Sequence, residues 1–313
     1  MEGSTESRRV PVLLGCTASG KSALAMRMAE LGPLEIVSAD SRQVYRMMDI
    51  GTAKPSKADR AAVRHHMIDL ADPSEPFSAA RFARQASALI ESMLGDRRAP
   101  LVVGGAGLYL LALAGRLDEL PGRDEALRNG LGEAEALEPG LLARFLSVLD
   151  PASMSAIGSP RDLVRIVRAL EIALLTGQRA SDLRSGGNEG SLWSGGRPPE
   201  LVFVGLRTED ADLKRSIELR VDSMIAAGLP EEVEHLYRGL GYGRDNSVLG
   251  CTIGYAELMD HMDGLCSMRE ARDSIVVNTW RFTRRQLRMF RRIGEVSWTG
   301  SSDPCEVRKL LYG

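Results

Sequence analysis

The sequence has few cysteines, and they are scattered. Cys16, Cys251, Cys266 and Cys305 are the four among 313 residues, and no two of them stand at C-x-x-C spacing. This distribution argues against a disulfide framework and against a structural zinc site, and it is expected where thiols stay reduced.

The chain also lacks a charge excess and long apolar runs. Forty Lys and Arg residues face forty-two Asp and Glu residues, which leaves a formal net charge of -2. The molecule as a whole therefore does not attract a polyanion, and any nucleic-acid site must be a local basic patch. The first ten residues are polar, and no apolar stretch reaches membrane-spanning length. We expect a cytoplasmic protein without a membrane partner.

What the sequence does contain is a regular alternation of short apolar runs and helical patterns. Hydrophobic residues make up 44% of the chain and charged residues 26%, as in soluble globular proteins. Four runs are typical of buried strands: Val10–Leu14, Leu34–Ser38, Pro100–Val103 and Leu201–Leu206. The alternation predicts an α/β fold with a parallel sheet flanked by helices.

The interval between the third and fourth runs is too long for a single crossover helix. It contains helical patterns from Asp124 to Leu149 and from Asp162 to Thr176. We predict an inserted all-helical subdomain over 118–197, with a core formed by 1–117 and 198–313. A Gly-, Ser- and Pro-rich stretch near 181–199 is typical of a mobile loop, and everything after Leu206 is expected to be helical.

The first strand leads into a phosphate-binding motif. Residues 15–22 read GCTASGKS and fit G-x-x-x-x-G-K-[ST], between the apolar run VPVLL and the helical run SALAMRMAEL. Glycines let the backbone curl around an anion, amides at the helix start face it, and Lys21 adds a positive charge. Ser22 can ligate a magnesium ion carried by the phosphates. The residues alone indicate a phosphate chain, as in a nucleotide kinase or NTPase, and a turn without a ligand remains the alternative.

A kinase would be expected to have an apolar strand ending in an aspartate that helps to bind magnesium. The third strand instead runs into Gly104-Gly105-Ala106-Gly107. An acid, Asp40, does follow the second strand, at the sheet edge where open α/β sheets bind ligands. Asp40 is therefore a candidate for chemistry on the phosphate ligand, and its structural alternative is to cap a turn.

Several segments together resemble one family. They are the P-loop, SADSRQVYRMMDIGTAKP at 38–55, HHMIDL at 65–70, VVGGAGLYL at 102–110, RIVRALE at 165–171 and IGYAEL at 253–258. In this order they resemble the tRNA dimethylallyltransferases, over the region from Val10 to about Arg292. The resemblance implies a P-loop NTPase-like sheet and a transfer of a dimethylallyl group from its diphosphate to an adenine amine.

The resemblance also implies roles for individual residues. Asp40 is expected to be the general base toward the exocyclic amine of the adenosine immediately 3′ of the anticodon, flipped out of its loop. Lys21, Arg220 and Mg²⁺ are expected to stabilise the departing diphosphate. On its pattern alone Arg220 would be a solvated helix-face arginine. The implied diphosphate-binding residues are Gly15, Thr17, Ala18, Ser19, Gly20, Lys21, Ser22 and Arg220, with Ser22 as the metal ligand.

Two basic stripes are candidates for RNA binding. One comprises Arg281, Arg284, Arg285, Arg288, Arg291 and Arg292, and the other Arg161, Arg165 and Arg168, each at helical spacing. Either could be a solvated helix face. The resemblance implies tRNA contacts at Asp40, Ser41, Arg42, Gln43, Ala106, Arg128, Val164, Arg165, Ile166, Val167, Arg168, Arg281, Arg284, Arg285 and Arg288. The expected partners are a tRNA anticodon stem-loop and dimethylallyl diphosphate, bound by a monomer.

The chain departs from the family pattern in places. Ala106 stands where the family usually has threonine, Ser159-Pro160-Arg161-Asp162 where it more often has His-Pro-Asn-Asp, and Trp280 where it usually has arginine. Losing the threonine hydroxyl removes one hydrogen bond, about 0.5–1.5 kcal/mol. Three alternative functions remain: a transferase acting on free adenine nucleotides, a P-loop kinase, and an RNA-binding protein without activity.

Overall fold

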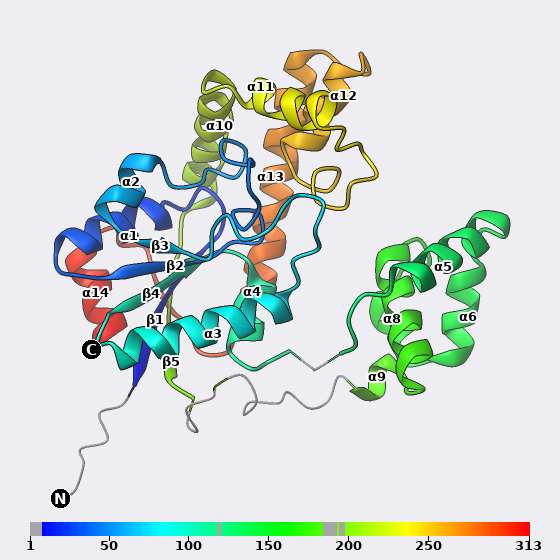
Figure 1. The fold of residues 1–313 in the computed structure, drawn as a ribbon, viewed down its shortest axis with the longest axis horizontal. Coiled ribbons are helices and arrows are strands. Elements are labelled where there is room, and N and C mark those ends of the chain that lie inside the picture. Colours follow the sequence, from blue (N-terminus) through cyan, green and yellow to red (C-terminus); the bar gives the residue numbers. More distant parts are fainter. Residues whose placement is uncertain (1–7, 118–119, 184–192, 194–197) are drawn as a thin grey trace, which may run out of the picture. The chain divides into compact units, whose positions relative to one another are not determined.

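The computed structural model describes residues 8–117, 120–183, 193 and 198–313. Its contacts divide the chain into two compact units. The first comprises Met1–Ala114 and Gly190–Gly313 and contains the sheet, and the second, Gly115–Glu189, is helical. Figure 1 shows the elements of each unit.

The sheet of the first unit has six parallel strands in the order β3-β2-β4-β1-β5-β6 (Figure 1). The strands are β1 (Arg9–Gly15), β2 (Glu35–Ala39), β3 (His65–His66), β4 (Pro100–Gly104), β5 (Glu200–Leu206) and β6 (Ser297–Thr299). The four apolar runs correspond to β1, β2, β4 and β5, so the prediction of a parallel α/β sheet is confirmed. Neighbouring strands pair in register, for example Val12 with Val102 and with Phe203.

The expectation that the chain is helical throughout after Leu206 is wrong at β6. This strand has three residues, of which Ser297 and Trp298 are exposed, and it pairs with β5 at the sheet edge. A strand this short with one free face carries no run of apolar residues, so its sequence pattern resembles a loop. β3 at the other edge is shorter still and is formed by two half-buried histidines.

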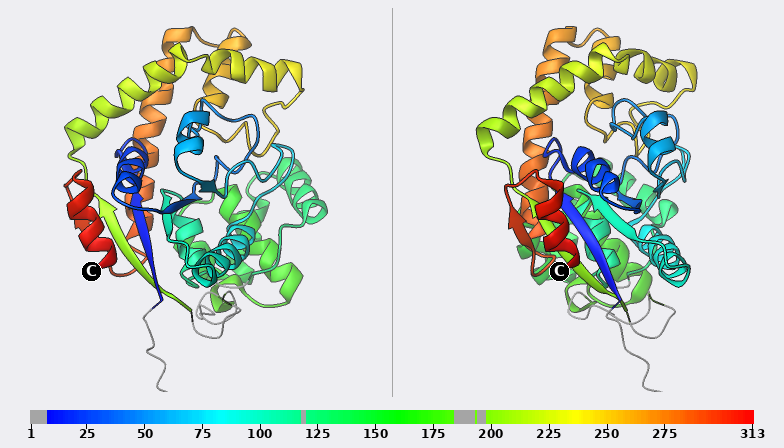
Figure 2. Two further views of the ribbon diagram at one scale, coloured as in Figure 1. Left: turned by 60° about the vertical axis from the view of Figure 1, so that its left-hand side comes forward. Right: turned by 90° about the vertical axis from the view of Figure 1, so that its left-hand side faces the viewer.

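Helices cover both faces of the sheet (Figure 2). On one face lie α1 (Lys21–Glu30) and α14 (Pro304–Tyr312), and on the other α3 (Ala79–Gly95) and α4 (Gly107–Leu113). Leu24, Met28, Val307 and Leu311 pack with strand residues such as Leu13 into a core between sheet and helices. This burial of apolar side chains is the main stabilisation of the unit. The short helix α2 (Lys57–Ala62) begins with a capping box between Ser56 and Asp59.

Four further helices and a π-helical turn complete the first unit. They are α10 (Asp210–Ala226), α11 (Leu229–Glu234), the π-helix η1 (His235–Gly239), α12 (Tyr255–Met262) and α13 (Met268–Phe290). α13 packs against α10 and α12 (Figure 1). No helix in the described part of the chain combines the length and apolar character that crossing a membrane requires.

The second unit consists of α5 (Glu125–Leu137), α6 (Leu141–Leu149), α7 (Pro151–Ile157), α8 (Leu163–Thr176) and α9 (Ala180–Leu183). The single helical pattern expected over 124–149 is two helices, because Gly140 has a φ of +85° and begins α6. Asp124 and Asp162 cap α5 and α8 through their carboxylates. Most of the loop expected near 181–199 lies outside the described residues, namely 184–192 and 194–197.

Candidate active site

The phosphate-binding loop follows β1 directly and ends at the start of α1. Ala18 and Gly20 have φ values of +65° and +84°, and the amide of Ser19 donates to the carbonyl of Cys16 at 3.2 Å. Gly20 is the N-cap of α1 and has no side chain that could bind the first amides of the helix. These amides are therefore available to an anion, which the helix dipole also favours.

Two serines of this loop also suit a phosphate ligand. The Oγ of Ser19 is buried without a hydrogen-bond partner among the described residues. A buried hydroxyl without a partner is unfavourable, and a phosphate oxygen would satisfy it. Ser22, in the first turn of α1, is exposed. Its hydroxyl oxygen is the hard type of ligand that magnesium prefers.

Lys21, Arg220 and the Asp40 carboxylate interact electrostatically near the P-loop. Burial lowers the pKa of Lys21, while the Asp40 carboxylate opposes this shift and Arg220 adds to it. Burial also lowers the pKa of Arg220, again opposed by Asp40. The Nζ of Lys21 donates to the carbonyl of Cys16 at 3.4 Å, and no described carboxylate lies within ion-pair distance of either cation. An anionic ligand would offset the cost of burying these two charges.

Asp40 combines a turn-forming role with a free oxygen. Its Oδ1 accepts hydrogen bonds from the amides of Arg42 at 2.8 Å and Gln43 at 3.3 Å. Oδ1 therefore caps the turn, which is the structural role expected as the alternative for Asp40. Oδ2 makes no hydrogen bond to any described residue, so one oxygen remains for a substrate proton.

A cavity of about 530 Å³ brings several of the candidate residues of the first unit together. Thr17 of the P-loop, Asp40 at the end of β2 and Arg220 on α10 all line it. The rest of the P-loop continues from Thr17 outside this lining. Apolar side chains form much of the remaining wall, among them Phe77, Tyr109, Met224, Ile275, Phe282 and Met289. The cavity can thus accept a ligand with an anionic end, an apolar part and a proton donor.

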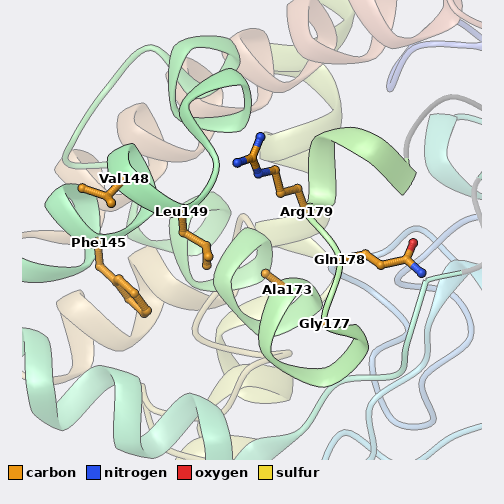
Figure 3. A pocket seen from close by; sticks show the side chains of 7 residues that line it. All are labelled: Phe145, Val148, Leu149, Ala173, Gly177, Gln178 and Arg179. Atoms are coloured by element: carbon orange, nitrogen blue, oxygen red, sulfur yellow. The ribbon is translucent and has the colours of Figure 1, made fainter.

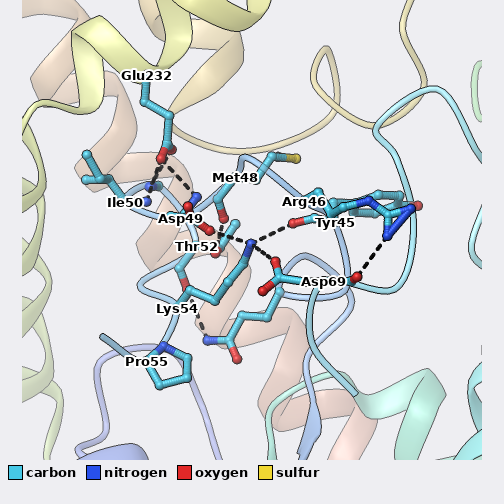
Figure 4. A network of polar contacts seen from close by, with 12 residues as sticks. Tyr45, Arg46, Met48, Asp49, Ile50, Thr52, Lys54, Pro55, Asp69 and Glu232 are labelled. Atoms are coloured by element: carbon cyan, nitrogen blue, oxygen red, sulfur yellow. Dashed lines mark hydrogen bonds and ion pairs between the residues drawn. The ribbon is translucent and has the colours of Figure 1, made fainter. Parts of the chain in front are cut away.

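The loop after Asp40 is fixed by a network of polar contacts (Figure 4). The Glu232 carboxylate accepts from the amides of Asp49, Ile50 and Gly51 at 2.7–3.0 Å and from the Tyr255 hydroxyl at 2.6 Å. A Cβ on Gly51 would come within 2.5 Å of the Tyr255 ring, so the loop packs tightly against α12. Gly51 and Thr52 line the cavity, and Glu232 therefore shapes its wall.

The same loop is fixed from its other side by Lys54. Its buried Nζ donates to the Tyr45 carbonyl at 2.7 Å and to the carboxylates of Asp49 and Asp69 at 2.6 and 2.7 Å. Burial raises the pKa of Asp69, but hydrogen bonds from Lys54 and Arg60 outweigh it and lower that pKa overall. The DIGTAKP segment thus supports the cavity rather than contributing its lysine to it.

We expect Glu232→Ala to destabilise the protein by roughly 2–4 kcal/mol, because it leaves three loop amides and the Tyr255 hydroxyl without their acceptor. Urea unfolding followed by tryptophan fluorescence measures this change. Glu234→Ala, on the exposed face of the same helix, is the control and should change the free energy of unfolding by less than about 0.5 kcal/mol. Equal effects of the two substitutions would refute the anchoring role.

The expected RNA contacts near Asp40 lie at the cavity or next to it. Ser41, Arg42 and Ala106 line the cavity. Gln43 forms internal hydrogen bonds: its Oε1 accepts from the Ser38 hydroxyl at 2.9 Å, and its Nε2 donates to the carbonyls of Thr52 and Ala53. In this structure Gln43 therefore connects the end of β2 with the DIGTAKP loop.

The basic residues of α13 differ in their surroundings. Arg285 lines the cavity and lies over the Phe282 ring at 5.8 Å. Arg284 stacks on Trp280 at 4.1 Å and pairs with Asp210 of α10. Arg281 and Arg288 are exposed on the same helix. Trp280, at a departure from the family pattern, thus orients Arg284 through a cation–π contact.

In the helical unit, two of the expected RNA-binding arginines bind a buried carboxylate. Glu171 is fully buried and accepts from Arg128 at 2.7 and 2.8 Å, from Arg168 at 2.5 Å and from the Asp124 amide at 2.8 Å. Burial raises the pKa of Glu171, but these hydrogen bonds outweigh it and lower the pKa to about 2. Along α8, Val164 and Arg165 are exposed, Val167 is half-buried, and Ile166 packs in the core.

This pKa predicts an acid-sensitive helical unit. Because the folded pKa of Glu171 lies below its ordinary value of 4.5, its charged form contributes stability above that value, roughly 3 kcal/mol. The contribution should be lost as the pH falls from about 4.5 to about 2. Amide hydrogen exchange in α5 and α8 measures it, and Glu171→Gln should flatten the pH dependence while the exposed Glu133→Gln should not. An unchanged profile in Glu171→Gln would contradict the argument.

A smaller cavity, of about 330 Å³, lies within the helical unit (Figure 3). Phe145, Val148 and Leu149 of α6 form one side, and Gln178 and Arg179 follow α8 on the other. It contains no residue that the sequence singled out.

Sequence reasoning missed several residues that shape the main cavity. Glu232 contacts amides more than 180 residues earlier in the chain, so no local pattern signals its role. Gln286 accepts a hydrogen bond from the P-loop amide of Thr17. Its position among the arginines of a basic stripe gave no indication of this contact. The apolar wall from α10 and α13 resembles ordinary core positions at helical spacing.

Comparison with known proteins places these features in a family. The family model for IPP transferase matches residues 43–293. A tRNA dimethylallyltransferase of Syntrophotalea carbinolica is 43% identical over 305 residues, covering 96% of this chain and 94% of its own length. One of Pelotomaculum thermopropionicum is 41% identical, with 94% and 92% covered. The crystal structure of a tRNA isopentenylpyrophosphate transferase of Bacillus halodurans has a TM-score of 0.65 and 36% identity, covering 94% of this chain and 90% of that one. The chain therefore belongs to the IPP transferase family.

Proposed function

We propose that this chain transfers a dimethylallyl group from dimethylallyl diphosphate to the exocyclic amine of the adenosine immediately 3′ of the anticodon in tRNA. The observation that carries the proposal is the shared cavity of Thr17, Arg220 and Asp40. Relatives of this chain that are named tRNA dimethylallyltransferases support the same activity.

The diphosphate would bind at the P-loop end of this cavity. The amides that begin α1, the unpartnered Ser19 hydroxyl and the cations Lys21 and Arg220 are all suited to its oxygens. When the allylic carbon–oxygen bond breaks, the leaving diphosphate gains charge, and donors already in place stabilise that charge without reorganising. Arg220 can offer two parallel N–H donors to it.

The acceptor adenine would enter between Asp40 and the apolar wall. Its amine nitrogen forms a bond to the allylic carbon as the bond from that carbon to the diphosphate oxygen breaks. The nitrogen then carries excess positive charge and loses a proton to Oδ2 of Asp40. An aspartate is a weak base, with an ordinary pKa of about 3.9, but the amine proton becomes acidic as the new bond forms.

A magnesium ion would fit beside this diphosphate. Ser22 supplies an exposed hydroxyl oxygen next to Lys21, and Mg²⁺ in phosphate sites is usually bound by few protein ligands and by phosphate oxygens. When bound, the ion would neutralise part of the diphosphate charge. Ser22 would orient it.

The RNA would be bound through basic residues of α13 and of the helical unit. Arg281, Arg285 and Arg288 of α13 are suited to anticodon-arm phosphates. In the helical unit Arg165 is exposed, whereas Arg128 and Arg168 would have to divide their donors between Glu171 and the RNA. We propose that the active species is a monomer.

The test compares acceptors directly. The protein is incubated with dimethylallyl diphosphate, Mg²⁺ and either an anticodon stem-loop or AMP, and prenyladenosine is measured by mass spectrometry. We expect product with the stem-loop and little with AMP, and equal or better use of AMP would overturn the tRNA proposal. Phosphate release from ATP without a prenyl diphosphate would instead indicate a kinase or ATPase.

A further inference from the structure

Gln286 of α13 connects two loops that belong to distant parts of the chain. Its Oε1 accepts a hydrogen bond from the P-loop amide of Thr17 at 2.9 Å, and its Nε2 donates to the carbonyl of Gly105 at 2.9 Å. The side chain is 6% exposed, so water competes little for either bond. Both polar ends of the amide are therefore used to join the P-loop to the loop after β4.

The packing around this amide is tight. A Cβ on Gly105 would come within 2.5 Å of the Gln286 Nε2 and 2.9 Å of the Gly15 carbonyl oxygen. The next residue, Ala106, donates its amide to the carbonyl of Ala39 at 3.1 Å. Ala39 immediately precedes Asp40, so hydrogen bonds and peptide groups connect the P-loop through Gln286 to the backbone next to the proposed base.

We propose that Gln286 is a positioning residue that fixes the distance between the diphosphate cradle and Asp40. This inference rests on the proposed function and adds a residue that touches neither reacting atom. By engaging the Thr17 amide, Gln286 withdraws that donor from the ligand and fixes the first turn of the loop. The amides of Ala18 and of Gly20 to Ser22 then face the diphosphate in one arrangement, while the Ser19 amide stays bonded to the Cys16 carbonyl.

The location of Gln286 on α13 adds a consequence for RNA binding. Arg285 precedes it and Arg288 lies two residues later on the same helix. An RNA bound to these arginines would restrain the helix that also fixes the P-loop. Gln286 is thus the side chain through which RNA binding at α13 would affect the arrangement of the diphosphate site.

Gln286→Met tests the proposal because it keeps the length of the side chain and removes both hydrogen bonds. We expect kcat for prenyl transfer to fall by about tenfold to a hundredfold, as expected from the loss of two buried hydrogen bonds. Binding of inorganic diphosphate with Mg²⁺, measured by calorimetry, should weaken by about tenfold. The affinity for an anticodon stem-loop should stay unchanged.

Thr283→Val is the matched control. Thr283 is fully buried one turn earlier on α13, and its hydroxyl donates to the Trp280 carbonyl of the same helix at 2.8 Å. This variant removes a buried polar group but no hydrogen bond to either loop, so its diphosphate affinity and kcat should match those of the wild type. Equal behaviour of Gln286→Met and Thr283→Val, whether both are impaired or neither is, would overturn the proposal.

Gln286→Glu supplies a readout that a purely structural role would not change. The carboxylate still accepts from Thr17 but opposes the Gly105 carbonyl, and its protonated form regains a donor. Burial raises the pKa of a carboxyl group, so the ratio of mutant to wild-type kcat should rise as the pH falls from about 8 to about 6. A constant ratio would count against the proposal. The diphosphate affinities of Gln286→Met and Thr283→Val decide the proposal even if the wild type fails to prenylate tRNA, which would refute only the proposed function.

Discussion

Asp40→Asn is expected to lower kcat for prenyl transfer by about 10²–10⁴-fold while leaving tRNA affinity nearly intact. The amide keeps an Oδ1 that can accept from the backbone of Arg42 and Gln43, so the turn after β2 is preserved. What the substitution removes is the basic oxygen that would receive the amine proton. Single-turnover prenylation of a stem-loop and a separate filter-binding assay measure the two quantities.

Asp40→Ala provides the comparison, because it removes the turn-forming oxygen as well as the base. If the lost proton acceptor accounts for most of the decrease in kcat, Asp40→Asn and Asp40→Ala should lower kcat by a similar factor. If the turn dominates, Asp40→Asn should retain most of the activity, and a wild-type rate in that variant would remove Asp40 as the base. Stem-loop affinity that falls in parallel with kcat would indicate a binding role instead.

The phosphate cradle and the carboxylate opposite it were predictable because both depend on local sequence. The fixed spacing of Gly15, Gly20, Lys21 and Ser22 between a strand and a helix predicts the loop whose amides begin α1. Asp40 was predictable because the carboxyl ends of parallel strands share one edge. The four long strands followed from their buried apolar runs, whose side chains face helices on both sides.

The remaining parts of the site depend on contacts that no local pattern encodes. Glu232 and Gln286 are polar helix residues whose loop partners are 181 to 269 residues away, and at helical spacing they are indistinguishable from solvated positions. The break of the long helical pattern at Gly140 was masked by apolar residues on both sides of it. The role of Lys54 was hidden because a lysine is expected at a surface unless buried partners such as Asp69 are known.

The largest effect on the donor side is expected from Arg220. Arg220→Ala should reduce kcat/KM for dimethylallyl diphosphate by about 10²–10³-fold, the loss typical when a preformed donor to a developing negative charge is removed. The half-buried Arg220 lines the same cavity as Thr17, and no described carboxylate neutralises it at ion-pair distance. The effect should appear in kcat as well as KM, because the charge on the diphosphate grows as the bond to carbon breaks.

Two companion variants separate charge from geometry. Arg220→Lys keeps a positive charge but loses the planar pair of donors, so it should recover part of the diphosphate affinity and little of kcat. Arg215→Ala, exposed on the same helix α10, is the control and should behave like the wild type. Affinity for inorganic diphosphate, measured by competition, should fall in Arg220→Ala together with kcat/KM. If that variant bound diphosphate as tightly as Arg215→Ala, the positive charge at this position would act on something other than the leaving group, and the cavity would have to bind its donor in a different orientation.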